Sequence, residues 1–589
     1  MTARKFHIIS ILFISIIAIC GCSPAPEITA QYDPTDIQFS GVRAFEIEDQ
    51  FVTQHINRVS GSDESLAAVE WLNEQLGESG WTCMIDKWDA VLYSETVELR
   101  NVVCRLPGES EQEILVVAHH DIAPTTEQGA DNDGSGVAVM LHLAEIFASE
   151  DKPRYTLAFV ADDAEEFGMI GSRRYLETHP NPDLIIAGIS LDNLGRAYYQ
   201  DMETELVGQY EGYAPIWIGL TAREAAAAAP TDWEVFLKGP IDQALNQAIT
   251  ISLTDQGPIN AYGVPAIGFG PKVPAEFSDL HYKCWHAPCD NMDIQSPYSL
   301  EQSGIITEAL IRQLLAMDTF PESTGPYLYF DGNSEVLTGW PLYLVFIGFV
   351  SLFFVGSYFI QRESLAEKVS SWIAAIPHFL GLWLPLVAGI LLLYLLVTAG
   401  IMQDFTSYPG TTKDVTQLNP SWLAVILFLV GLGVFFFIGR WLVRRLDGNR
   451  QAPEFGSIKS LAFLITGVIA LLILIIDPFA LIFFVPVLFW FLIGGRSGAG
   501  KILDVLLFIL GGLMIYALIY VFGFLLLRYD FVFLWYFISA ISTGTFSFVD
   551  VAAGAAVMAA GLSMIINPPS RSYTGKNRSG AQSYERRYF

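Results

Sequence analysis

The composition of the chain changes abruptly near Trp340, and this change limits what the 589 residues can fold into. Residues 23–339 contain 51 acidic and 15 basic residues, whereas residues 340–589 contain 11 acidic and 16 basic residues and consist mostly of long apolar runs. A run of about 20 apolar residues is long enough to cross a bilayer as a helix. The sequence therefore predicts a water-soluble domain followed by a membrane domain.

Apolar segments of roughly this length follow one another in the second half. They lie at 341–360, 379–401, 421–439, 460–476, 479–494 and 502–527, and a longer region covers 531–566. Basic residues gather after the third and fifth segments and in the tail 568–589, which marks these parts as cytoplasmic. If the first domain is outside, a cytoplasmic tail requires an odd number of crossings. We expect seven helices within 340–567, with eight as the alternative.

The N-terminus has the layout of a signal peptide, with Arg4 and Lys5 before an apolar run that ends at Ile19. The following Cys20-Gly21-Cys22 resembles a bacterial lipobox, so residues 1–22 are expected to be a signal peptide with Cys22 as the acylated residue. An uncleaved signal anchor is the alternative. Both interpretations place a domain at 23–319 outside the cytoplasm of a bacterium, joined by a linker at 320–339 to the membrane half.

Export permits disulfide bonds. Cys83 and Cys104 lie on neighbouring predicted strands, and Cys284 and Cys289 bracket His286. Both pairs can be oxidised, although spacing alone leaves the connectivity open.

The acidity of residues 23–339 opposes binding to nucleic acid or to anionic lipid. It suits solubility in a saline exterior, or attraction of cations and basic substrates. Membrane lipid is therefore expected only around the apolar helices of the second half.

Helical and strand-like segments alternate along the first domain. Helices are predicted at 41–57, 62–79, 134–148, 172–177, 242–251 and 300–317, and strands at 82–88, 97–106, 114–118, 155–161, 184–191 and 266–270. This alternation predicts an α/β fold with a mixed, largely parallel sheet and helices on both faces. Residues 196–240 are expected to form an insertion near the mouth of the site.

Acidic and imidazole side chains follow the ends of the predicted strands. They are His119 and Asp121, the loop Gly129–Gly136 with Asp131 and Asn132, the pair Glu165 and Glu166, then Asp192 and His286. Open α/β sheets build their sites at these strand ends. Carboxylate and imidazole ligands indicate a site for one or two zinc-like ions, and a paired glutamate adds a general base for hydrolysis.

These motifs, together with Phe159-Val160-Ala161, Gly171-Ser172 and Trp285-His286-Ala287-Pro288, resemble the M28 family of zinc peptidases over roughly residues 41–318. The resemblance implies a zinc exopeptidase fold, a peptide substrate and two zinc ions. It implies that His119, Glu166, Asp192 and His286 are metal ligands, that Asp121 orients His119, and that Glu165 is the general base.

One position departs from the family pattern. The bridging aspartate of the family falls on Asn132, which Asp131 and Asp133 flank. An amide carries no charge and has only one good donor oxygen. Three outcomes are open: the loop slips so that Asp131 bridges, Asn132 ligates weakly in a one-metal enzyme, or metal binds without useful turnover.

The resemblance favours a membrane-anchored aminopeptidase. A carboxypeptidase or glutaminyl cyclase on the same scaffold is the first alternative, with Arg173, Arg174 and Arg196 as candidates for holding a substrate carboxylate. A peptide-binding or membrane-assembly module without turnover is the second. The segment Thr254–Pro258 has Gln256 where the family often has a pocket histidine, and His281 is expected in a pocket or surface role.

Overall fold

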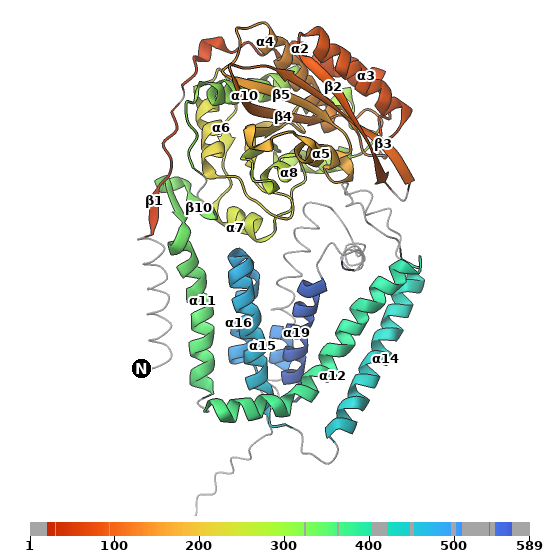
Figure 1. Ribbon diagram of the computed structural model, residues 1–589, viewed down its shortest axis with the longest axis vertical. Coiled ribbons are helices and arrows are strands. Elements are labelled where there is room, and N and C mark those ends of the chain that lie inside the picture. Colours follow the sequence, from red (N-terminus) through yellow and green to blue (C-terminus); the bar gives the residue numbers. More distant parts are fainter. Residues whose placement is uncertain are drawn as a thin grey trace, which may run out of the picture.

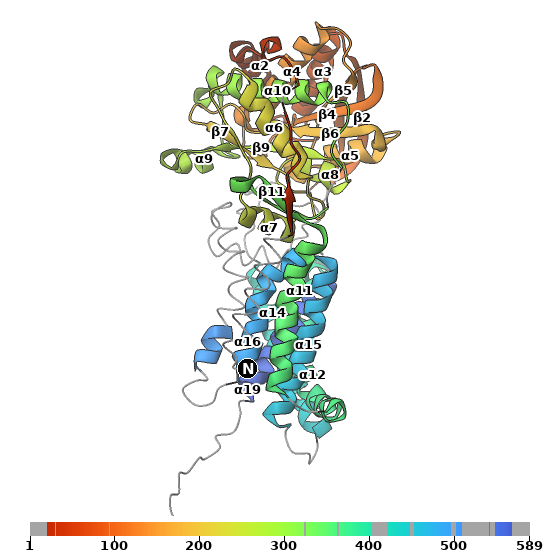
Figure 2. The ribbon, with the colours of Figure 1, turned by 90° about the vertical axis from the view of Figure 1, so that its left-hand side faces the viewer.

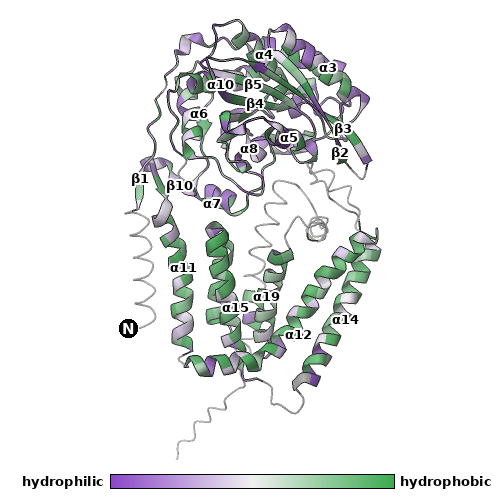
Figure 3. Ribbon diagram, viewed as in Figure 1, coloured by the Kyte–Doolittle hydropathy of each residue, from purple (hydrophilic) through white to green (hydrophobic). Residues whose placement is uncertain are grey.

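The computed structural model describes residues 21–567 except for residue 30 and residues 93–94, 323–324, 362–363, 403–420, 448–452, 496–501, 509–540 and 542–547. Figure 1 shows an α/β domain, named the ectodomain below after its expected location, above a group of long helices. Figure 3 shows that these helices are mostly apolar, whereas the α/β domain mixes polar and apolar residues.

An eight-stranded mixed sheet forms the centre of the ectodomain. Its strands are β2 (Thr82–Leu92), β3 (Glu95–Leu106), β4 (Ser110–His119), β5 (Tyr155–Asp162), β6 (Ile185–Ser190), β7 (Gln200–Glu205), β8 (Val235–Phe236) and β9 (Ala266–Lys272). They are ordered β2-β3-β5-β4-β6-β9-β7-β8, and the central four, β5, β4, β6 and β9, are parallel. The predicted fold class is confirmed.

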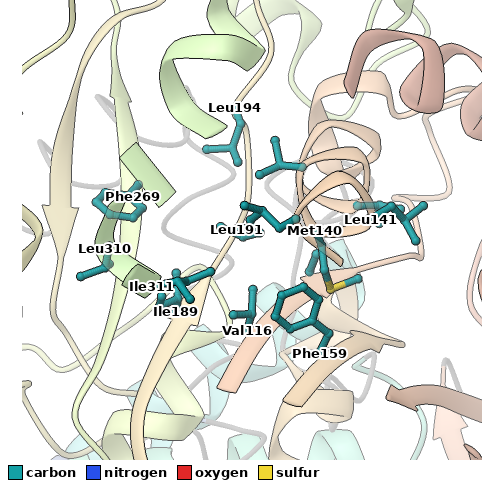
Figure 4. Close-up of a cluster of buried hydrophobic side chains, with 14 of the residues drawn as sticks. Val116, Met140, Leu141, Phe159, Ile189, Leu191, Leu194, Phe269, Leu310 and Ile311 are labelled. Atoms are coloured by element: carbon teal, nitrogen blue, oxygen red, sulfur yellow. The ribbon is translucent and has the colours of Figure 1, made fainter. Parts of the chain in front are cut away.

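Strand β4 shows why both faces of the sheet are covered. Its Val116 joins a large core formed with α2 (Gly41–Gln54), α3 (Asp63–Glu78), α4 (Ser135–Ala148), α6 (Ile216–Ala228) and α10 (Pro297–Ala316). Its Leu115 and Val117 point to a smaller core against α5 (Ile170–Thr178) and α8 (Gln256–Ala261). Alternate residues of a strand face opposite sides, so a continuous apolar run needs helices on both. Figure 4 shows Val116 of the large core near Phe159 and Met140.

Local capping sets the starts of two helices of the ectodomain, α3 where predicted and α10 three residues before the predicted start at residue 300. The Ser62 hydroxyl accepts a hydrogen bond from the Ser65 amide at the start of α3. Ser296 caps α10 in the same manner, and Pro297 occupies its first turn. Such caps satisfy amide groups that have no partner inside the helix.

Residues 196–240 are not an insertion, and that expectation was wrong. They supply β7 and β8 to the sheet and α6 to the large core, where Trp217 is 2% exposed. Helix α6 packs against α10. The strands are short and β7 is polar, so their sequence lacks the pattern of a buried strand.

The expected linker at 320–339 also contains regular structure. Strands β10 (Tyr327–Phe330) and β11 (Glu335–Thr338) form a hairpin, and β1 (Cys22–Pro24) pairs with β11. The view in Figure 2 shows this small sheet at the upper end of the first membrane helix. It joins the start of the ectodomain to the start of the membrane domain.

The membrane half contains five described helices that are long and apolar enough to cross a bilayer. They are α11 (Gly339–Ile360), α12 (Leu365–Thr398), α14 (Trp422–Asp447), α15 (Phe455–Ile476) and α19 (Phe548–Ile566). The predicted segment 479–494 contains α16 (Leu481–Ile493), which is shorter. Most of 502–527 and the first part of 531–566 lie outside the described residues, and so do residues 1–20 of the expected signal peptide and the tail 568–589. Seven spans therefore remains a prediction.

Both proposed cysteine pairs are disulfide bonds. Cys83 joins Cys104 across the β2–β3 pair, where the two residues are in register, and Cys284 joins Cys289 around His286. The first bond fastens two neighbouring strands, and the second closes a short loop at the site.

Candidate metal centre

The sheet brings the predicted site residues together because β5, β4 and β6 are neighbours. His119 is the last residue of β4, Glu165 and Glu166 form a short turn of 3-10 helix three residues after β5, and Asp192 lies two residues beyond β6. The carboxyl ends of these parallel strands meet at one edge. The loop with Asn132 leads from that edge into α4.

Asn132 lies at the middle of the cluster. Its Oδ1 is 2.8 Å from Nε2 of His119, while its Nδ2 is 2.8 Å from Nε2 of His286 and 3.1 Å from Oε1 of Glu166. Nε2 of His119 is 3.8 Å from Oε2 of Glu165 and 3.8 Å from Oδ1 of Asp192. The amide thus separates a His119 side from a side formed by Glu166 and His286.

His286 reaches the cluster from a tight loop after α9 (Ser278–Cys284). It has a left-handed backbone with φ of 50°, and its carbonyl accepts a hydrogen bond from the Thr125 hydroxyl at 2.7 Å. A residue with a side chain takes such a backbone conformation only when its surroundings hold it there. Here the neighbouring disulfide and Thr125 do so.

Asp121 contacts both His119 and the glutamate pair, and its backbone carbonyl lies 3.1 Å from Nδ1 of His119. Its Oδ1 accepts a hydrogen bond from the Glu165 amide at 3.1 Å and lies 3.5 Å from Nδ1 of His119. Its Oδ2 accepts from the Ser60 hydroxyl at 3.0 Å. Although burial opposes it, contact with His119 lowers the pKa of Asp121. The carboxylate therefore connects the β4 end to the glutamate pair.

The cluster is buried and rich in carboxylates. Glu165 is 6% exposed and Glu166 is 1% exposed. Burial raises the pKa of both glutamates, and although burial opposes it, neighbouring carboxylates, Glu165 foremost, raise the pKa of His119. Acidic groups held this closely in a buried site favour a bound cation.

The donor set fits a metal ion. Ligand atoms of His119, Asp133 and Asp192 lie within 4.8 Å of one another. Oδ2 of Asp133 and Oε2 of Glu166 are buried and have no hydrogen-bond partner among the described residues. Zinc prefers nitrogen and oxygen donors of these types. His119, Asp133 and Asp192 can hold one ion, and Glu166 and His286 offer donors for a second.

The structure does not bring Asp131 to this cluster. Its carboxylate pairs with Nε of Arg196 at 2.8 Å, accepts from the Tyr199 hydroxyl at 2.5 Å and accepts from the Gly195 amide at 3.0 Å. Asp290 also holds the loop, since it accepts from the amides of Asp131 and Asn132. These contacts oppose a slip of the loop, so Asn132 takes the middle position and Asp133 faces His119.

Sequence reasoning gave no role to Asp133, Asp290 or Tyr199. Asp133 flanks Asn132, and Asp290 follows His286 by four residues, so both lie close in sequence to predicted site residues. Spacing alone does not say which of two carboxylates next to an amide turns inward.

The expected arginines do not offer a common pocket for a carboxylate. Arg196 is completely buried between Asp131 and Asp290, Arg174 pairs with Asp86 at 3.0 Å, and Arg173 is exposed. Gln256, the first residue of α8, donates a hydrogen bond to the Ser252 hydroxyl in the preceding loop.

His281 lies against Arg196, and its Nδ1 is 3.2 Å from the Arg196 guanidinium. Burial and this positive charge lower the pKa of His281 to about 3. It is not among the metal-ligating cluster found in the described residues.

The α/β domain carries a buried group of side chains that can hold a metal ion. Residues 101–311, which lie in this domain, match peptidase family M28. The apolar helices add a membrane domain to it.

Known proteins share parts of this sequence. A vacuolar membrane protease of Clavispora lusitaniae is 36% identical over 110 residues, which is 18% of this chain and 10% of that protein. The BOS complex subunit NCLN of Gallus gallus is 36% identical over 106 residues, 15% of this chain and 19% of that protein. A probable zinc metalloprotease of Pyrenophora teres f. teres is 35% identical over 119 residues, 18% of this chain and 25% of that protein. The chain thus matches a quarter or less of the length of these three relatives.

Solved structures resemble the ectodomain at low identity. Glutaminyl cyclase of Porphyromonas gingivalis is 22% identical, with 47% of this chain and 98% of that chain covered and a TM-score of 0.38. The zinc aminopeptidase BSAP of Bacillus subtilis is 14% identical, with 49% and 99% covered and a TM-score of 0.41.

Proposed function

We propose that the protein is a membrane-anchored, zinc-dependent exopeptidase, most specifically an aminopeptidase. The observation that carries this proposal is the place of Glu165. Its carboxylate lies 3.8 Å from the ligand nitrogen of His119, and Asp121 holds its backbone amide. A general base must stand beside the water that it activates, and Glu165 lies next to the donor set that would hold this water.

In this mechanism each residue has a separate task. His119, Asp133 and Asp192 would hold a zinc ion, and Glu166 and His286 would offer donors for a second. When bound, zinc lowers the pKa of a water molecule and polarises the scissile carbonyl. Glu165 takes the proton from the attacking water and delivers it to the leaving amine. Asp121 keeps the side chains of His119 and Glu165 in position during both proton transfers.

The surroundings of the site favour an aminopeptidase over a carboxypeptidase. A carboxypeptidase needs a positive group for the substrate carboxylate. Arg196 is buried between two carboxylates and Arg174 is paired with Asp86, so neither supports that alternative. A strongly acidic ectodomain attracts the ammonium group of a peptide N-terminus.

A second candidate function rests on Asn132. Its amide satisfies His119, Glu166 and His286 at once, at distances of 2.8 to 3.1 Å. Because the neutral amide hydrogen-bonds to these side chains, it can stabilise the cluster when fewer than two metal ions are bound. A peptide-binding or membrane-assembly module without turnover would use such an arrangement, and a BOS complex subunit is among the relatives.

We also propose that the ectodomain lies outside the cytoplasm of a bacterium, on its periplasmic or outer side. Its two disulfide bonds support this location. Cys22, the residue expected to be acylated, begins β1 and pairs with Leu337, two residues before the first membrane helix. A lipid at Cys22 and the helices of the membrane half would then hold the same side of the ectodomain.

The test is release of amino acids from a mixed peptide pool by the full-length protein, with zinc content measured on the same sample. Release from N-termini that stops with a chelator and returns with zinc would support the aminopeptidase. Stoichiometric metal without any release, in a folded protein that still binds peptides, would reject turnover and favour the binding module.

A further inference from the structure

A cavity of about 560 Å³ lies on the flank of the ectodomain, outside the cluster of metal ligands. Strand β7, the loop before β8, the 3-10 turn Ala275–Phe277 and the first turn of α10 surround it. Its walls include the rings of Tyr198, Trp233, Phe277 and Tyr298 and the carboxylates of Asp201 and Asp232. None of the residues that line it is basic.

The aromatic rings are held in fixed positions. Tyr198 stacks on Phe277 with ring centres 5.1 Å apart and an interplanar angle of 12°. Trp233 meets Tyr298 edge-on, with centres 6.4 Å apart. Tyr198 and Trp233 are buried, whereas Phe277 is 37% exposed and Tyr298 is 49% exposed. The cavity therefore presents ring surface to solvent on a rigid base.

The carboxylates of Asp201 and Asp232 both act on the ring of Tyr298 at the cavity wall. Asp232 accepts a hydrogen bond from the Tyr298 hydroxyl at 3.3 Å, and Asp201 accepts one from the Glu234 amide at 3.0 Å. Burial and the charges of Asp232 and Asp201 raise the pKa of Tyr298. Both carboxylates are thus within electrostatic reach of one exposed ring.

We propose that this cavity binds the guanidinium or ammonium group of a basic side chain carried by a peptide. Aromatic faces attract cations, and nearby carboxylates add charge complementarity. The volume falls in the range of small-ligand sites. Arg196 donates to the Tyr198 hydroxyl from behind the wall of the cavity, and its charge is paired with Asp131 and Asp290.

The position of the cavity favours a ligand from solution over one from the bilayer. Figure 2 shows β7 on the flank of the ectodomain, above the small sheet at the membrane helices. Tyr199 lines the cavity and donates to Asp131, so a peptide bound here lies beside the loop of the metal centre. The inference itself stands without hydrolysis, because it concerns binding alone.

The experiment is calorimetric titration of the full-length protein in detergent with N-acetylarginine amide. N-acetylcitrulline amide is the neutral counterpart, and phosphocholine represents a lipid headgroup. We expect the arginine probe to bind about tenfold more tightly than the citrulline probe, with or without a chelator. The double variant Asp201→Asn with Asp232→Asn should weaken binding about tenfold, since both carboxylates lose their charge.

The matched control is Asp183→Asn, which removes an exposed carboxylate two residues before β6 that does not line the cavity. It should leave binding unchanged. Tyr298→Leu is a second variant, which keeps an apolar side chain but removes the ring, and it should also weaken binding. Equal binding of the citrulline probe, tighter binding of phosphocholine, loss of binding with chelator, or full binding by both cavity variants would each overturn the proposal.

Discussion

The two ends of strand β4 hold buried acidic groups in opposite ways. At its carboxyl end, Asp133 and Glu166 near His119 each keep a buried oxygen without a hydrogen-bond partner among the described residues. At its amino end, Glu113 accepts from the Tyr175 hydroxyl and from Nε of Arg105 at 3.0 Å. Glu113 is only 3% exposed, so burial alone does not distinguish the two ends.

The pKa values differ accordingly. Burial raises the pKa of Glu165 and Glu166 at the metal centre. Burial also acts on Glu113, but hydrogen bonds from His179, Tyr175 and Arg105 lower its pKa overall. A buried carboxylate with a full set of donors stabilises the fold, whereas a group of carboxylates that lack donors is suited to bind a cation.

The largest expected effect is on catalysis. Glu165→Gln should lower the turnover of a peptide substrate by about 1,000-fold, because the amide cannot accept the proton of the attacking water. Zinc content, measured by atomic emission on the same protein, should stay unchanged. Turnover within tenfold of the original would show that Glu165 is not the base.

Glu113→Gln tests the buried carboxylate at the amino end of β4. It leaves Arg105 and His179 near a neutral group, so we expect the ectodomain to lose about 2 kcal/mol of unfolding free energy. Thermal unfolding would show this as a lower midpoint, with turnover within twofold of the original. Glu111→Gln, an exposed change on the same strand, is the control and should not shift the midpoint.

Asn132→Asp should add a negative charge to the metal centre at the carboxyl end of β4. The carboxylate can share two cations, so we expect zinc to be retained about tenfold more tightly against a chelator. Asn181→Asp, at an exposed position, provides the matched control. Weaker zinc retention in Asn132→Asp would mean that the amide, and not a carboxylate, suits the ligands at this position.

The smallest expected effect is on acid stability. Because the folded pKa of Glu113 is lowered from 4.5, its contribution is present above the unfolded pKa and is lost as the pH falls through the folded value. The difference in unfolding midpoint between the original and Glu113→Gln should therefore shrink below about pH 4. A difference that stays constant from pH 7 to pH 3 would contradict the assignment of a charged Glu113.

The sequence by itself determined much of this architecture. Local capping at Ser62 and the apolar run of β4 produced the predicted helix and strand, and the apolar segments predicted the membrane helices. The sequence also predicted that His119, Glu165 and Asp192 lie at one edge of the sheet, because they follow neighbouring parallel strands whose carboxyl ends meet there.

Only the tertiary structure decided what the loop around Asn132 does. Asp131 and Asp133 are equivalent neighbours in sequence, but buried Arg196 and Tyr199 hold Asp131 away from His119. The tertiary structure likewise decided the place of β7 and β8 at the edge of the sheet, where strand pairing and packing outweigh the weak strand pattern of their sequence. In both cases the deciding contacts come from residues far along the chain, which spacing and periodicity do not record.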